Sequence, residues 1–181
     1  MRRSLLLRAF TLLCLALAPS WIAAGEAPSA APGLPADAAP GSDVSPATAA
    51  ALVGKPGVHL VDVRTEAEFA YVGHPVGAVN VPLLRFDPKT YGMAANPKFI
   101  DEIRARFSPD DTLLMICRSG SRSSKAAKLL VEAGYRKSFN VLEGVEGDAD
   151  ADGHRTVNGW KVRGLPYEYA VDPAKVTPPA P

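Results

Sequence analysis

Short apolar runs alternate with helical segments through the middle of the chain, and this alternation constrains the fold more than any other feature. Apolar runs of strand length occur at 58–63, 78–81, 112–116 and 138–142. The run at 112–116 is almost purely apolar, as expected for a central strand of a parallel sheet. Strands separated by helices predict an α/β domain with a central, mainly parallel sheet flanked by helices.

Local signals mark where the predicted helices begin. Ser45 followed by Pro46 predicts a helix that runs to about Val53, because serine caps helices and proline suits their first turn. Thr65 and Glu68 form a capping-box pair that predicts a second helix start. Further helices are expected from residue 96 and over 122–133, the latter ending before a glycine.

The run from Cys117 to Ser123 carries the residues suited to chemistry, and it follows the predicted central strand directly. Ligands of open α/β sheets bind at the carboxyl ends of strands, and a helix N-terminus attracts anions. Gly120 permits a tight curl, while Arg118 and Arg122 add positive charge. These features favour a thiolate at Cys117, so we expect it to be a nucleophile rather than an inert core cysteine.

Three parts of the chain resemble the rhodanese domain family. The first is this loop, which is similar to the family's active-site loop with its leading nucleophilic cysteine. The others are Leu60–Phe69 continuing into Gly73–Pro82, and Gly159–Trp160 with Gly164–Tyr167. The family's usual Gly-His-Ile-Pro-Gly-Ala pattern is altered at Pro75 and Val76, which is expected to affect only a turn. The likeness covers about residues 44–170.

The resemblance implies a rhodanese-like fold and a sulfurtransferase. Cys117 would take a sulfane sulfur from a donor such as thiosulfate and pass it, as a persulfide, to a nucleophilic acceptor such as cyanide or a thiol. Backbone N–H groups would stabilise the persulfide, and the two arginines would hold the donor's sulfonate. The substrate-binding residues implied are Arg118, Ser119, Gly120, Ser121, Arg122 and Ser123. Neither a cofactor nor a metal is implied.

Two other functions are weighed against this one. Phosphatases of a related fold have one more residue in the loop, whereas four residues separate Cys117 from Arg122 here, and the smaller ring suits sulfur better than phosphate. The second alternative is a persulfide carrier or sulfur-relay binding module without fast turnover of small molecules. Because function depends on the site rather than the fold, turnover with small donors would separate these cases.

An acidic segment further on matches half of a calcium-binding pattern. Asp148, Asp150, Asp152 and Gly153 fit the start of such a loop, but Gly159 occupies the twelfth position, where a bidentate glutamate belongs. We therefore favour a solvated acidic turn over a calcium site.

Several other polar or aromatic residues are expected to be structural. Asp62 and Arg64 are predicted to form an internal ion pair. His74 is expected to stack in a turn beside Pro75, and Trp160 to anchor the C-terminal segment.

The beginning of the chain is typical of a secretory signal peptide. Arginines at positions 2, 3 and 8 precede an uncharged apolar run at 9–18, and small residues follow up to Gly25. The run is shorter than the roughly 20 residues of a membrane span, which disfavours an uncleaved anchor. We expect residues 1–24 to be removed and the protein to be exported, with the periplasm as its compartment. Cys117 is then the one remaining cysteine.

Both flanks of the predicted domain, 44–172, are poor in large apolar residues. Residues 25–43 are predicted to be a disordered Ala/Pro-rich linker, and 173–181 a flexible tail with four prolines. A net charge of +1 gives no sign of nucleic-acid binding or of membrane binding after signal cleavage. The expected partners are a small sulfur donor and a thiophilic acceptor, with a sulfur-relay protein as a further class.

Overall fold

A five-stranded parallel sheet forms the centre of the computed structural model, which describes residues 33–35 and 37–177. The strands lie in the order β1 (Asp43–Val44), β8 (Ser138–Val141), β7 (Thr112–Ile116), β2 (Val58–Asp62) and β4 (Val79–Asn80). Every neighbouring pair is parallel. The prediction of an α/β fold with a mainly parallel central sheet is therefore confirmed.

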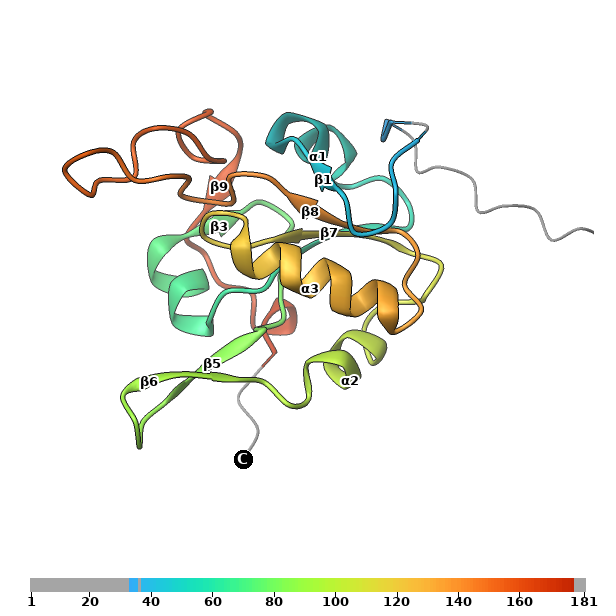
Figure 1. Cartoon of the computed structure of the whole chain (residues 1–181), viewed down its shortest axis with the longest axis horizontal. Helices are drawn as coiled ribbons and strands as arrows, with labels where there is room; N and C mark the ends of the chain where they lie inside the picture. Colours follow the sequence, from blue (N-terminus) through green and yellow to red (C-terminus); the bar gives the residue numbers. More distant parts are fainter. Residues whose placement is uncertain (1–32, 36, 178–181) are drawn as a thin grey trace, which may run out of the picture.

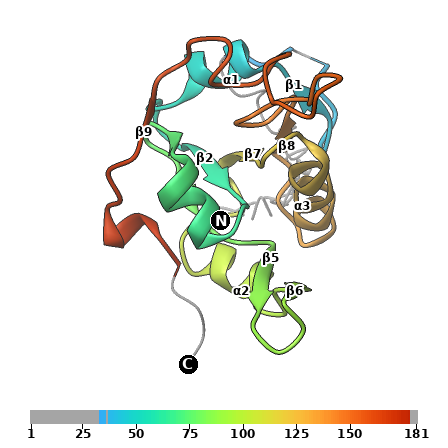
Figure 2. The same ribbon diagram turned by 90° about the vertical axis from the view of Figure 1, so that its left-hand side faces the viewer.

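Helices cover both faces of the sheet (Figures 1 and 2). On one face, α1 (Pro46–Leu52) and the helical segment η1 (Glu68–Val72) contribute to a core that includes Leu114 and Ile116 of β7. On the other, α2 (Phe99–Arg104) and α3 (Ser121–Glu132) pack against a core that includes Leu113 and Met115. Successive β7 residues thus serve opposite faces, which explains why this strand is apolar throughout.

The predicted helix start at Thr65 has the expected cap but an unexpected helix type. The Thr65 backbone N–H donates to Glu68 Oε2 at 3.1 Å, and the Glu68 N–H donates to Thr65 Oγ1 at 3.2 Å, so the capping box is confirmed. The segment that follows is a five-residue π-helix rather than an α-helix, and it ends at Gly73 with φ of 82°. Single π-helical turns occur frequently at functional sites.

Two small antiparallel pairs were not predicted. β3 (His74–Pro75) pairs with β9 (Tyr167–Glu168), and β5 (Leu84–Asp87) pairs with β6 (Gly92–Ala95). The β5–β6 hairpin projects from the body of the molecule (Figure 1). Its turn is fixed by the Asp87 carboxylate, which accepts from the N–H of Lys89 and the hydroxyl of Thr90, both at 2.9 Å.

The predicted linker begins to contact the domain earlier than expected. Leu34 is buried within the core on the α1 side of the sheet, the Gly41 N–H donates to the Ser138 carbonyl at 2.7 Å, and Asp43 pairs with Asn140. The prediction of a disordered linker is therefore wrong for this part, because backbone pairing with β8 and one apolar side chain hold it. Residues 25–32, like the predicted signal peptide, lie outside the described residues.

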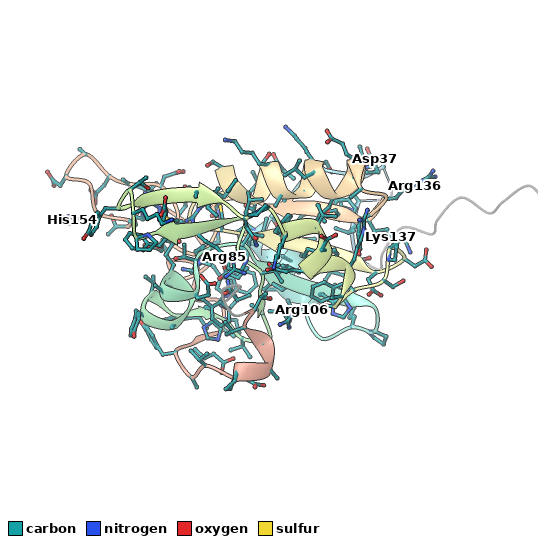
Figure 3. The ribbon with its side chains drawn as sticks, turned by 90° about the horizontal axis from the view of Figure 1, so that it is seen from below. Asp37, Arg85, Arg106, Arg136, Lys137 and His154 are labelled. Carbon is teal, nitrogen blue, oxygen red and sulfur yellow. The ribbon has the colours of Figure 1, made fainter. Side chains whose placement is uncertain are left out.

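The predicted flexible tail is also attached as far as residue 177. It forms a short 3-10 helix, η2 (Pro173–Lys175), and Val176 then bridges Asn80 at the edge of β4. The Arg106 guanidinium donates to the carbonyls of Ala174 and Val176, each at 3.1 Å (Figure 3). The prediction is wrong for 173–177 because these contacts join positions about 70 residues apart, and 178–181 lie outside the described residues. No described helix is both long and apolar enough to span a bilayer.

Candidate active site

Cys117 lies where β7 ends, at the start of the loop that leads into α3. Its side chain is buried in the core between the sheet and helices α2 and α3, with 1% exposure. The sulfur accepts a hydrogen bond from the Gly120 N–H at 3.2 Å and another from the Ser123 hydroxyl at 3.2 Å. The Ser123 hydroxyl shares its one proton between this sulfur and the Gly120 carbonyl, 3.1 Å away, and both donors stabilise negative charge on the sulfur.

Gly120 gives the loop its shape. It is the N-cap residue of α3 and adopts the left-handed conformation, with φ of 95°, as the predicted tight curl requires. Among the described residues no side chain caps this helix start, and its first turn holds no acidic residue. The partial positive charge of the helix N-terminus is therefore free to interact with the Cys117 sulfur and with an anion bound beside it.

A second loop, residues 142–147 after β8, binds the backbone of the cysteine loop. The Val145 N–H donates to the Cys117 carbonyl at 2.8 Å, and the Glu146 N–H donates to the Arg118 carbonyl at 2.9 Å. Gly144 makes this contact possible, since a Cβ there would lie 2.4 Å from the Cys117 carbonyl oxygen. Backbone hydrogen bonds from this second loop therefore hold two carbonyls of the cysteine loop. Sequence reasoning missed this support, whose one visible trace is the glycine pair at 144 and 147.

Arg122 is held by Glu68 rather than by loop carbonyls. Its Nη1 and Nη2 donate to the two carboxylate oxygens at 2.7 and 2.6 Å, which forms a bidentate pair. Burial by itself raises the pKa of Glu68, but the hydrogen bonds and charge of Arg122, together with hydrogen bonds from Thr65, lower it to about 2. Glu68 thus compensates the charge of Arg122 in this structure, and the implied role of Arg122 in holding a sulfonate stays a prediction.

Arg118 has different surroundings. It is exposed and, within the described residues, forms no ion pair. A cleft of about 400 Å³ opens beside it, lined by Thr65, Glu68, Leu84, Met93, Arg118 and Arg122. Both loop arginines therefore reach this cleft, but Arg118 supplies its uncompensated positive charge. Of the other residues implied to bind substrate, Ser119 is half-buried and Ser121 is exposed.

The predicted ion pair of Asp62 and Arg64 is confirmed. Both side chains are fully buried, and Arg64 Nη2 lies 2.6 Å from Asp62 Oδ2. The same nitrogen donates to the Gly73 carbonyl at 2.8 Å, while the Asn80 amide donates to the carbonyls of Asp62 and Arg64 at 2.9 Å. This network fixes the chain on both sides of η1, the segment that presents Glu68 to Arg122.

His74 and Trp160 are structural, as expected. The His74 ring stacks on Phe69 with centroids 3.6 Å apart, so its stacking partner is Phe69 of η1. The Trp160 indole is buried, and its N–H donates to the Pro166 carbonyl at 2.8 Å, which anchors the C-terminal segment.

The acidic segment after residue 147 forms a turn with its own hydrogen bonds. Asp150 accepts from the N–H groups of Asp152 and His154 and from the Thr156 hydroxyl, at 3.0, 2.8 and 2.6 Å. Asp150, Asp152 and His154 each bring a potential ligand atom within 4.8 Å of the others. His154 projects at the periphery of the molecule (Figure 3). Hydrogen bonds within the turn account for the arrangement.

Fold and site together define an α/β domain with a buried cysteine in the loop that leads into the N-terminus of a helix. The chain belongs to the rhodanese-like domain family, whose sequence profile matches residues 45–150.

Similarity to individual proteins agrees with this assignment. The chain is 33% identical over 110 residues to thiosulfate sulfurtransferase 16, chloroplastic, from Arabidopsis thaliana, covering 61% of this chain and 79% of the relative. It is 40% identical over 87 residues to thiosulfate sulfurtransferase 18 from the same plant, covering 47% and 62%. The crystal structure of Rv0390 from M. tuberculosis superposes with a TM-score of 0.62 and 38% identity, covering 71% of this chain and 98% of the other. These relatives support a general sulfurtransferase-type assignment.

Proposed function

We propose that this protein is a sulfurtransferase that carries sulfur as a persulfide on Cys117. The observation that carries the proposal is the pair of donors on one sulfur, since the Gly120 N–H and the Ser123 hydroxyl both contact Sγ at 3.2 Å. Hydrogen-bond donors at this position stabilise negative charge on the sulfur as it attacks the sulfur-donating molecule and leaves again. The uncapped N-terminus of α3 adds to the same effect.

The proposed reaction has two steps. The Cys117 thiolate attacks the outer sulfur of thiosulfate, a new S–S bond forms, and the bond to the sulfonate sulfur breaks so that sulfite leaves with the electron pair. An acceptor such as cyanide then attacks the outer sulfur of the persulfide, and Cys117 leaves as a thiolate. Each step regenerates an anion beside the same donors, so the site needs no separate base.

Thiosulfate as the donor is supported by charge and by similarity. Arg118 offers an uncompensated cation at the cleft, which suits a sulfonate. Two relatives at 33 and 40% identity are named thiosulfate sulfurtransferases. Arg122 is assigned a positioning role through Glu68.

We further propose an exported location, for which N-terminal sequencing of the purified protein is the test.

Mass spectrometry of the intact protein tests the central proposal. After incubation with thiosulfate the protein is expected to gain one sulfur atom, and Cys117→Ser is expected to abolish both the gain and thiocyanate formation. Once residues 1–24 are removed, Cys117 is the one cysteine of the sequence, so a gained sulfur atom is assigned to it directly. Undiminished turnover in Cys117→Ser would contradict the proposal. Loading with sulfur followed by slow release to cyanide would instead favour a persulfide carrier.

A further inference from the structure

The β5–β6 hairpin has one apolar face. In its antiparallel register Leu84 lies opposite Ala95, and Phe86 lies opposite Met93. Opposed residues share a face, and so do alternate residues of one strand, so these four apolar side chains lie together. Arg85 belongs to the other face.

Within the described part of the chain this apolar face is largely open to solvent. Phe86 is 56% exposed and Met93 is 48% exposed. Tyr91, in the turn, is 85% exposed and contacts the Phe86 ring edge-on, with centroids 6.4 Å apart. A two-stranded hairpin is marginally stable alone, and a contiguous exposed apolar surface indicates an interaction site.

The same face continues into the cleft beside the cysteine loop. Leu84 and Met93 line that cleft together with Arg118 and Arg122. Strands of this length extend about 13 Å, so the apolar surface reaches well beyond a bound thiosulfate or cyanide ion. Phe86 does not line that cleft; together with Arg85 it lines a separate hollow of about 610 Å³ farther along the hairpin. An occupant that covers the whole face must therefore be larger than either small ion.

Charge at the cleft indicates what such an occupant carries. Glu68 compensates Arg122, whereas Arg118 is exposed and lacks an ion-pair partner among residues 37–177. The N-terminus of α3 adds partial positive charge, since its first turn holds no acidic residue. The cleft is positively charged and has an apolar wall. A ligand that matches both features carries a negative charge within an apolar segment. A cysteine thiolate in an apolar stretch of polypeptide meets both requirements.

The base of the hairpin is fixed in place by ion pairs. Arg85 pairs with Glu66, and its Nη2 donates to the Glu102 carboxylate at 3.0 and 3.2 Å. Asn96 donates to the same carboxylate at 2.7 Å. Arg85 thus joins the hairpin to α2 and to the residues just before η1 (Figure 3). A preorganised surface binds a partner with less loss of conformational entropy.

We propose that the apolar face of the β5–β6 hairpin is the docking surface for a partner protein whose cysteine, within an extended apolar segment, accepts sulfur from Cys117. This inference rests on the sulfurtransferase function proposed above. The partner's thiolate attacks the outer sulfur of the Cys117 persulfide and forms a new S–S bond. The old S–S bond breaks, Cys117 leaves as a thiolate with the electron pair, and the partner holds the persulfide without net oxidation or reduction.

The test uses the full chain loaded with thiosulfate and three acceptors. The first is cyanide. The other two are peptides of about nine residues with a central cysteine, one flanked by leucine and phenylalanine and one by serine and glycine, because each flank then reaches more than 10 Å. Transfer is followed by mass spectrometry in the unmodified protein, in Phe86→Ser, and in Leu129→Ser. Leu129 is a control of similar exposure, 43%, near the other end of α3.

We expect the apolar peptide to react about tenfold faster than the polar one, the order given by burial of one large apolar side chain. Phe86→Ser should remove this preference and leave cyanide turnover within about twofold, and Leu129→Ser should keep the preference. Equal rates for the two peptides, or an unchanged preference in Phe86→Ser, would overturn the docking surface. If the unmodified protein neither loads sulfur nor turns over cyanide, the proposed sulfurtransferase function itself is contradicted. If Phe86→Ser does not fold, Tyr91→Ser tests the same surface at a more exposed position.

Discussion

The two arginines of the cysteine loop differ in whether a carboxylate compensates their charge. Arg122 is locked to Glu68 by two hydrogen bonds of 2.7 and 2.6 Å. Arg118 is exposed at the cleft. The bidentate pair keeps one guanidinium in a fixed place, so it shapes the loop, while the other is able to meet an incoming anion. Substitutions at the two positions should therefore have different kinetic effects.

Arg118→Ala is expected to raise the thiosulfate KM about tenfold, because a charge-assisted hydrogen bond contributes roughly 1.5–3 kcal/mol. Alkylation of Cys117 by iodoacetamide, a neutral reagent, should change by no more than a few-fold. Arg122→Ala should impair both reactions, since it releases Glu68 and the loop. Thiosulfate kinetics measured alongside alkylation rates check the prediction. An unchanged KM in Arg118→Ala would contradict the donor-binding role.

At the scale of elements, two segments distant in sequence converge on the cysteine loop. η1 supplies Glu68 from one side, and the loop at 142–147 binds the carbonyls of Cys117 and Arg118 from behind. Gly144, with φ of 64°, stands where this second loop approaches most closely. The geometry around the sulfur therefore depends on a backbone contact as well as on side chains.

Gly144→Ala is expected to abolish most turnover and to destabilise the fold. A Cβ there would lie 2.4 Å from the Cys117 carbonyl oxygen and 2.6 Å from the Arg118 carbonyl, so the cysteine loop must shift. Gly134→Ala is the matched control, because Gly134 also has a positive φ, 102°, but a Cβ there meets nothing within 4 Å. The control should lose only about 1–2 kcal/mol and keep its activity. Thermal unfolding and thiocyanate formation measure both effects, and equal losses in the two variants would refute the argument.

The elements that could be predicted are those specified by nearby residues. β7 matches its apolar run, the Ser45 hydroxyl caps α1 by accepting the Thr48 N–H at 3.1 Å, and α3 begins within one residue of its expected start. The β5–β6 hairpin was missed because its strands have four residues each, and β6 consists of glycine, methionine and alanines, which give little strand signal.

The site was predictable as a loop but not as a three-dimensional arrangement. Its position between a buried strand and a helix follows from local pattern, and so does the conformation of Gly120. The pairing of Arg122 with Glu68 joins residues 54 positions apart, and no periodicity encodes such a contact. The support from Val145 and Glu146 is made by backbone N–H groups, which nearly every residue possesses, so the glycines at 144 and 147 were its one trace in the sequence.

At the scale of the whole molecule, the Glu68–Arg122 pair links the site to acid stability. The pKa of Glu68 falls from 4.5 to about 2 in the folded protein, so its ionised form stabilises the fold above pH 4.5. That contribution, about 3 kcal/mol at most, is lost as the pH falls from 4.5 through 2. Glu68→Gln should therefore show a flatter loss of unfolding free energy in this window. Denaturant unfolding at several pH values measures it, and identical slopes in both proteins would count against the pair.

The segment at 173–177 has a further consequence, because it lies along the outer edge of the sheet. β4 pairs with β2 on one side, and on the other Asn80 bridges Val176 and accepts the Thr177 N–H at 3.1 Å. An uncovered edge strand offers unpaired backbone groups to another chain and invites aggregation. Removing residues 173–181 should therefore increase self-association, seen as light scattering at temperatures where the full chain stays monodisperse. In this view, a few residues that contain no catalytic group protect the sheet from acting as a template for polymerisation.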